Sequence, residues 1–196
     1  MSESKPRGQV IFLTGPTLAG KTTTAMAWAA QRSRITAPMD WDELRGTLFR
    51  GSRLQAADDI STEYRFAARI ATLTAAHIID SGFDCLIAGP RVPAGPNDPP
   101  SWVGVWDELD QLQPITIALL PSLETRLERR RLDPGRVQAL SEDSVRESHR
   151  WAWESWREQP RADVLDTSEM TLDQVLVAVE QTAARLTDRP LRAADA

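Results

Sequence analysis

The sequence contains a single cysteine, Cys85, which lies in the apolar segment FDCLIAG. One cysteine cannot form a disulfide within the chain, and it supplies no set of thiolates for a structural zinc cluster. A disulfide-stapled domain and a zinc ribbon are therefore excluded. We expect Cys85 to be a small core residue.

Long apolar runs are also missing. No stretch reaches the roughly 20 apolar residues that span a bilayer, and the first residues, MSESKPRG, lack the apolar segment of a secretory signal. We therefore expect a cytoplasmic protein that has no membrane partner. The formal net charge of -5 argues against nucleic acid as a partner, because a surface that holds a phosphodiester backbone is usually basic.

Lysine is almost absent, since only Lys5 and Lys21 stand among 23 lysine and arginine residues. Lys21 belongs to the segment GPTLAGKT at residues 15–22, which follows the apolar run VIFLT. This segment matches the pattern G-x-x-x-x-G-K-[ST] of a phosphate-binding loop. A compact ammonium suits that position, whereas the chain uses arginine for nearly every other cation.

Each residue type in this pattern has a physical reason. Glycine lets backbone N–H groups turn inward around a phosphate, and the N-terminus of the following helix adds a favourable dipole. Lys21 would contact the β- and γ-phosphates of ATP, and the Thr22 hydroxyl would coordinate Mg²⁺. A glycine-rich turn capped by threonine is the simpler interpretation. We favour nucleotide binding, by Gly15, Pro16, Thr17, Leu18, Ala19, Gly20, Lys21, Thr22 and Thr23.

Strands and helices are expected to alternate along the chain. Five short apolar runs predict buried strands, namely QVIFLTG, RITAPMD, FDCLIAGP, PITIALLP and ADVLDTS. Helix-forming composition or helical spacing predicts helices over residues 22–31, 64–79 and 172–186. Parallel strands need crossover connections, so this order predicts an α/β fold, a parallel sheet with helices on both faces. We expect one domain over residues 1–196, with an ordered core at about 9–186.

A pair of carboxylates, Asp40 and Asp42, follows the second predicted strand in the segment MDWDEL. Beside a phosphate loop, two carboxylates could divide the work of phosphoryl transfer. We assign Asp42 as the base for an attacking hydroxyl and Asp40 as a partner of the metal. Alternatively, either aspartate only caps the next helix. Trp41, which stands between them, could form a wall for an organic acceptor.

Arginines gather in the segment RLERRRLDPGRVQALSEDS, where we expect a lid at about residues 129–142. Arg131 and Arg136 flank the turn LDPG, from which a guanidinium could stabilise charge on the transferred phosphoryl group. For three arginines we prefer a solvated basic helix that pairs with acidic neighbours; these are Arg126, Arg129 and Arg130. Two further arginines are candidates for contact with the acceptor, Arg65 and Arg91.

The chain resembles the small P-loop kinases of the shikimate and gluconate kinase type and the chloramphenicol phosphotransferase type. The resemblance extends from VIFLTGPTLAGKTT through MDWDEL to RLERRRLDPGR and VLDTS. It implies a five-stranded parallel sheet in the order 2-3-1-4-5, ATP on the phosphate loop under a mobile lid, and Asp42 as the carboxylate that activates the acceptor. The chain departs from many relatives in IAGPRVP, which has no acidic residue after the third strand. Metal binding would then depend on Thr22, phosphate oxygens, water and Asp40.

These patterns predict an enzyme that uses ATP and Mg²⁺ and transfers the γ-phosphoryl group to a hydroxyl of a small metabolite, nucleoside or antibiotic. The sequence has no N-K-x-D guanine-reading motif and no L-S-G-G-Q transporter signature. Two alternatives stay open. A nucleoside monophosphate kinase would bind the acceptor phosphate with Arg65 and Arg91, and a nucleotide-dependent switch would transfer nothing. Monomer and homodimer are both compatible with the sequence.

Overall fold

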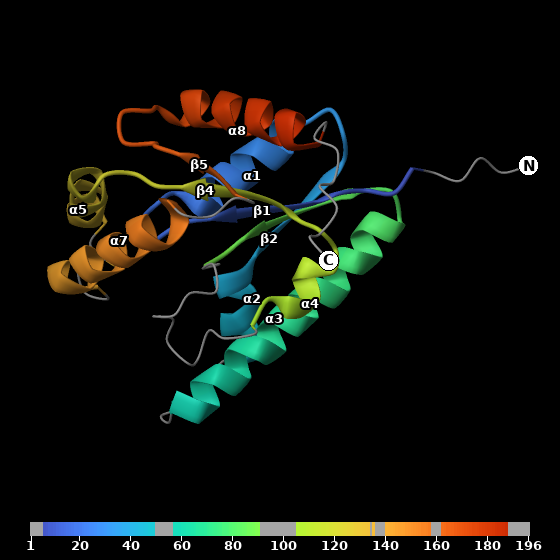
Figure 1. Cartoon of the computed structure of the whole chain (residues 1–196), viewed down its shortest axis with the longest axis horizontal. Coiled ribbons are helices and arrows are strands. Elements are labelled where there is room, and N and C mark those ends of the chain that lie inside the picture. Colours follow the sequence, from blue (N-terminus) through green and yellow to red (C-terminus); the bar gives the residue numbers. More distant parts are fainter. Residues whose placement is uncertain are drawn as a thin grey trace, which may run out of the picture.

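A computed structural model describes residues 6–49, 57–90, 105–133, 135, 140–157 and 162–187 (Figure 1). The strands are β1 (Val10–Thr14), β2 (Thr36–Asp40), β3 (Asp84–Ala88), β4 (Ile115–Leu119) and β5 (Ala162–Leu165). The helices are α1 (Lys21–Gln31), α2 (Trp41–Leu48), α3 (Ala57–Asp80), α4 (Asp107–Asp110), α5 (Leu123–Leu132), α7 (Glu142–Arg157) and α8 (Leu172–Thr187). All five strands therefore form where apolar runs predict them.

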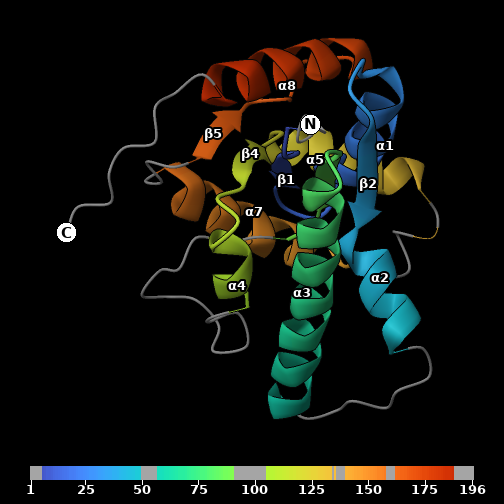
Figure 2. The same cartoon turned by 90° about the vertical axis from the view of Figure 1, so that its right-hand side faces the viewer.

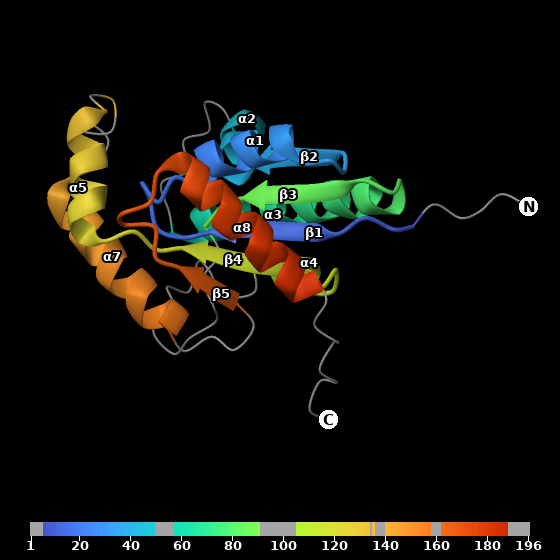
Figure 3. The same ribbon diagram turned by 90° about the horizontal axis from the view of Figure 1, so that it is seen from above.

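The five strands make one parallel sheet in the order β2-β3-β1-β4-β5, which confirms the predicted fold class and strand order. The two strands at the centre, β1 and β3, are buried along their whole length. Their sequences are almost continuously apolar because a central strand of a covered sheet has no solvent face. Figure 3 shows the strands running in one direction toward α5 and α7.

Helices cover both faces of the sheet (Figure 2). One core lies between the sheet and α1 and α8, and it takes Ile11 and Leu13 from β1. The other core lies under α2, α3 and α4, and it takes Val10 and Phe12 from the same strand. Successive side chains of a strand point to opposite faces, so β1 contributes to both cores, as β3 does. Among the described helices, none is long and apolar enough to cross a membrane.

Small residues of α3 pack toward the sheet. Ala68, Ala71 and Ala75 are buried in the core under this helix, together with Ile79 near its end. Cys85 on β3 is fully buried in this core, as expected, and burial raises the pKa of its thiol to about 12. The thiol therefore stays protonated and acts as a small apolar group.

A buried carboxylate joins three elements at the amino ends of the strands. Asp84 accepts hydrogen bonds from the Gln9 N–H at 2.9 Å and from Arg32 Nη2 at 2.9 Å, and it forms an ion pair with Arg34 Nε at 3.1 Å. Its side chain is fully buried, whereas that of Arg32 is 12% exposed. Asp84 thus connects the start of β1, the end of α1 and the start of β2, on the side away from the phosphate loop.

We predict that Asp84→Asn lowers the free energy of unfolding by about 3 kcal/mol, because a partly buried guanidinium loses its carboxylate while the side-chain shape stays the same. Urea denaturation measures this loss. The control is Asp80→Asn, which removes an ion pair with Arg7 whose two side chains are 59% and 62% exposed. That change should cost less than about 1 kcal/mol, and equal losses in the two variants would contradict the prediction.

Candidate functional site

The phosphate-loop motif occupies the predicted strand, loop and helix context. Residues 15–20 leave the carboxyl end of β1, and α1 begins directly afterwards at Lys21. The residue before α1 is Gly20, with φ of 90°, and it provides no side-chain cap. The first N–H groups of α1 therefore have no capping oxygen from Gly20, and such a helix start attracts an anion.

Position 15 requires glycine for two reasons, its backbone conformation and the lack of space for a side chain. Its φ of 138° is one that side-chain-bearing residues rarely adopt, and a β-carbon there would lie 2.2 Å from the carbonyl oxygen of Leu119 on β4. The loop thus leaves β1 in close contact with the end of the neighbouring strand. Any larger residue at position 15 would push the loop away from the sheet.

Lys21 lies over its own loop. Its Nζ donates a hydrogen bond to the carbonyl oxygen of Pro16 at 3.1 Å, and the N–H of Ala19 donates to the same oxygen at 3.1 Å. The ammonium is therefore held at the loop, where a bound phosphate would meet it. The contact of Lys21 with a phosphate stays a prediction.

The hydroxyl of Thr22 donates a hydrogen bond to the Oδ2 atom of Asp40. The other carboxylate oxygen of Asp40 accepts the N–H of Glu43 at 2.9 Å and so caps α2. Asp40 is therefore a helix cap and also a neighbour of the phosphate loop, two interpretations that the sequence leaves as alternatives.

The oxygen atoms of Thr22 and Asp40 fit a magnesium ion. Mg²⁺ usually takes one or two protein oxygens and completes its shell with phosphate oxygens and water. Within the described part of the chain, no group of three or more His, Cys, Asp and Glu residues could hold a metal. The two oxygens would therefore hold Mg²⁺ together with the nucleotide.

The end of β3 has no room for the acidic residue that the sequence lacks there. Ala88 pairs with Asp40 in the register of β2 and β3, and Gly89 follows. A β-carbon on Gly89 would lie 2.9 Å from the β-carbon of Trp41. The carboxylate at this edge of the sheet thus comes from β2 instead of β3.

Asp42 and Trp41 have different surroundings, although they are adjacent in sequence. Asp42 is exposed in the first turn of α2. Trp41 is 1% exposed, and its ring contacts Tyr64 and Trp106 at centroid distances of 5.4 Å and 5.7 Å. The indole of Trp41 is therefore a core residue, which corrects the expectation of an open pocket wall.

An arginine that is paired with a carboxylate, Arg45, lies one helical turn after Asp42. Arg45 Nη1 lies 2.6 Å from Glu63 Oε1, and its guanidinium carbon lies 5.4 Å from the centroid of the Tyr64 ring. Burial raises the pKa of the Tyr64 phenol; the positive charge of Arg45 opposes this rise, while Asp42 and Glu63 add to it. This cluster joins α2 to α3, and the sequence does not reveal it because its members lie on different helices.

Two arginines of α5 contact the phosphate loop. Arg126 Nε donates to the carbonyl oxygen of Thr17 at 2.9 Å, and Arg129 Nη1 donates to that of Leu18 at 3.0 Å. Arg126 is fully buried, which lowers its pKa to about 10, and burial also lowers the pKa of Arg129. The expectation of a solvated basic helix is therefore wrong for both residues. Their spacing of three residues places both on one helix face and is the signal that could have identified them.

The remaining predicted arginines are not brought together by the described structure. Arg131 is exposed at the end of α5, and Arg65 is exposed on α3. Arg91 and Arg136 lie outside the described residues. The lid at about 129–142 is described only in part, so the roles of these four arginines stay predictions.

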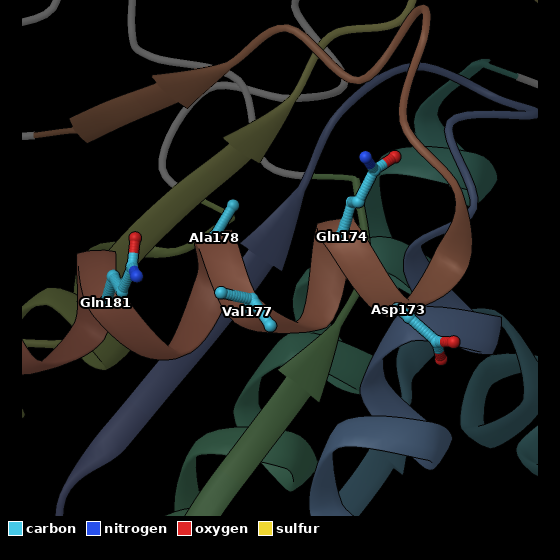
Figure 4. A pocket seen from close by; sticks show the side chains of 5 residues that line it. All are labelled: Asp173, Gln174, Val177, Ala178 and Gln181. Atoms are coloured by element: carbon cyan, nitrogen blue, oxygen red, sulfur yellow. The ribbon is translucent and has the colours of Figure 1, made fainter.

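One surface hollow lies over α8 (Figure 4). It is lined by Asp173, Gln174, Val177, Ala178 and Gln181, all from that single helix. Neither the phosphate loop nor α2 contributes to it. We therefore place the candidate site at the carboxyl ends of β1 and β2 instead.

The chain matches no protein-family model and no curated protein by sequence. Its structure is similar to thymidylate kinase from Candida albicans, with a TM-score of 0.67 and 14% identity over 92% of this chain and 93% of that one. It is also similar to shikimate kinase from Acinetobacter baumannii in complex with shikimate, with a TM-score of 0.66 and 18% identity over 96% of this chain and 100% of that one. A third similar structure is the tunicamycin resistance protein of Deinococcus radiodurans, with a TM-score of 0.61 and 17% identity over 92% and 96%.

These similarities cover nearly the whole length of each chain. The chain therefore has the P-loop kinase fold, with the parallel strand order 2-3-1-4-5.

We predict that Lys21→Met weakens ATP binding by about 10- to 100-fold, because one charge-assisted hydrogen bond to phosphate is lost while the volume is kept. Isothermal titration calorimetry with ATP and Mg²⁺ measures the dissociation constant. Lys5→Met is the matched control, since it removes the other lysine of the chain. Equal affinity of the Lys21 variant and the wild type would remove the assignment of the loop.

Proposed function

We propose that this protein is a kinase-type phosphotransferase that moves the γ-phosphoryl group of ATP to a hydroxyl of a small molecule. The observation that supports this most is that the two carboxylates beside the phosphate loop, Asp40 and Asp42, have different contacts. Asp40 accepts the Thr22 hydroxyl and caps α2, so Asp42 is not needed as a cap. Asp42 is exposed two residues later, where it can accept a proton.

In this proposal, the inward N–H groups of the loop, the start of α1 and Lys21 hold the phosphates. Thr22 and Asp40 would hold Mg²⁺ together with phosphate oxygens, and the ion would supply positive charge that stabilises the transferred phosphoryl group. The acceptor oxygen forms a bond to the γ-phosphorus as the bond to the bridging oxygen breaks. ADP leaves, and the acceptor proton passes to Asp42.

The charge balance beside Asp42 supports an acceptor whose reacting group is a hydroxyl. Arg45 stands one helical turn after Asp42, and its guanidinium is already bound to the Glu63 carboxylate, which is 7% exposed. A phosphate group on the acceptor would compete with this carboxylate for Arg45. A neutral hydroxyl compound would leave the ion pair intact.

A nucleoside monophosphate kinase is the second candidate. The structural similarity to thymidylate kinase favours it, and the exposed Arg65 on α3 would bind the acceptor phosphate in that case. A nucleotide-dependent switch would bind ATP and transfer nothing.

Phosphate transfer from ATP to a mixed panel separates the three candidates. The panel holds sugars, hydroxylated metabolites, nucleosides, antibiotics and nucleoside monophosphates, and mass spectrometry identifies every compound that gains one phosphoryl group. Transfer to a neutral hydroxyl compound supports the proposal. Transfer confined to monophosphates supports the second candidate, and ATP binding without any transfer supports the switch.

We predict that Asp42→Asn lowers kcat by about 10²- to 10⁴-fold on the acceptor that the panel identifies, because the amide cannot take the acceptor proton. The lower end applies if the carboxylate mainly orients the hydroxyl, since a loose transition state needs little early deprotonation. Steady-state kinetics measure kcat, and calorimetry tests that ATP affinity is kept.

Asp40→Asn is the matched comparison for the Asp42 variant. Asparagine caps a helix about as well as aspartate, so α2 keeps its start, while the negative charge and the oxygen that accepts the Thr22 hydroxyl are removed. This variant should need more Mg²⁺ for half-maximal activity. Should Asp42→Asn turn over the acceptor at the wild-type rate, Asp42 is not the base.

A further inference from the structure

The phosphate loop contains a turn that its sequence disfavours. The N–H of Ala19 donates to the carbonyl oxygen of Pro16 at 3.1 Å, so residues 16–19 form a hydrogen-bonded turn. Leu18, its third residue, has φ of 67°, whereas Thr17 is not among the described residues with positive φ. This combination is a type II turn, which prefers glycine or asparagine at the third position. A leucine there is unfavourable because its β-carbon crowds the backbone.

The two α5 arginines bind the carbonyl groups of that turn. Thr17 and Leu18 are its central residues, and their carbonyl oxygens accept from Arg126 and Arg129 at 2.9 Å and 3.0 Å. The Thr17 carbonyl belongs to the central peptide, and type I and type II turns differ by a rotation of this peptide through about half a turn. Leucine alone favours the type I orientation. The hydrogen bond from Arg126 favours type II.

The orientation of the central peptide decides what the loop presents to a phosphate. In a planar trans peptide the C=O and N–H groups point in opposite directions. When the Thr17 carbonyl is held against α5, the N–H of Leu18 points to the opposite side. A phosphate loop binds through inward N–H groups, so the orientation that suits Arg126 is also the one that suits a phosphate.

Arg126 is also fixed by a contact with α7. Its side chain is fully buried, and Nη2 donates to Ser148 Oγ on α7 at 2.6 Å. With a pKa of about 10 it stays protonated at neutral pH, so its bond to the Thr17 carbonyl is charge-assisted. Figure 3 shows α5 and α7 beyond the carboxyl ends of β1 and β4, on the side from which this contact comes.

We propose that Arg126 is a positioning residue, which holds the central peptide of the turn at residues 16–19 in the orientation that Leu18 disfavours, and so keeps the Leu18 N–H aimed at the nucleotide phosphates. This proposal rests on nucleotide binding by the loop. It differs from a purely structural role, in which Arg126 only packs α5 against α7.

A double-mutant cycle between Arg126→Met and Leu18→Gly separates these roles. Calorimetry with ATP and Mg²⁺ should show that Arg126→Met weakens binding by about 10-fold or more in the wild-type background. The same substitution should weaken binding much less in the Leu18→Gly background, because glycine adopts positive φ without help. An equal loss in the two backgrounds would overturn the proposal.

Ser148→Ala is the matched control. It removes the contact of Arg126 with α7 and leaves the bond to Thr17, so it should lower the urea midpoint without showing the coupling to Leu18→Gly. If Arg126→Met does not fold, Arg126→Lys is measured in the same cycle. Lysine keeps the charge but lacks the planar guanidinium that donates to both the Thr17 carbonyl and Ser148. Coupling of Ser148→Ala as strong as that of the Arg126 variant would support the structural role instead.

Nuclear magnetic resonance gives a readout that needs no nucleotide. The N–H of residue 18 rotates with the central peptide and lies close to the Thr17 Hα only in the type II orientation, so the nuclear Overhauser effect between these two protons should weaken in Arg126→Met and recover in the double variant. If the wild-type protein bound no ATP while this pattern held, nucleotide binding would be refuted and the positioning of the turn would stand. An unchanged Overhauser effect in Arg126→Met would overturn the positioning role.

Discussion

A loop that turns its N–H groups toward a phosphate must turn carbonyl groups away from it, and each outward carbonyl needs a hydrogen-bond donor. In this protein α5 provides donors, since Arg126 and Arg129 bind the carbonyl oxygens of Thr17 and Leu18. In the proposed nucleotide site, the glycines and the lysine of the motif account for the side of the loop that faces the phosphates. The outward side depends on a helix more than 100 residues away in sequence, with separations of 109 and 111 residues.

Arginine and lysine have different roles on the two sides of the loop. A guanidinium carries several donors in a fixed plane, which suits carbonyl and carboxylate oxygens inside the protein, whereas a compact ammonium suits a phosphate. Arg45 accordingly pairs with Glu63, and Arg32 with the buried Asp84. Lys21 is the lysine that stands at the phosphate loop. Much of the positive charge in the described structure thus holds elements together, and its abundance in the sequence does not indicate an anionic partner.

The sequence predicts the fold well, because each signal behind it is local. Apolar runs locate the five strands, and the parallel order follows from crossover connections together with the family resemblance. The site is predicted less completely. Thr22 and Asp40 do lie together, but the role of Arg126 depends on a contact that no local pattern contains, and acidic neighbours on the same helix suggest a solvated side chain instead. Trp41 shows the same limit, because its burial depends on Tyr64 and Trp106, which are distant in sequence.

The spacing of the two aspartates has a structural origin. Because Gly89 packs against Trp41, the end of β3 cannot carry a longer side chain, and the carboxylate at that edge comes from Asp40 on the neighbouring strand. Asp40 also begins α2 as its cap, so the chain turns into a helix immediately after it. The next residue is then directed into the core, as Trp41 is, and the one after it is exposed, as Asp42 is. One helix start thus separates a carboxylate that contacts the phosphate loop from a carboxylate that faces solvent.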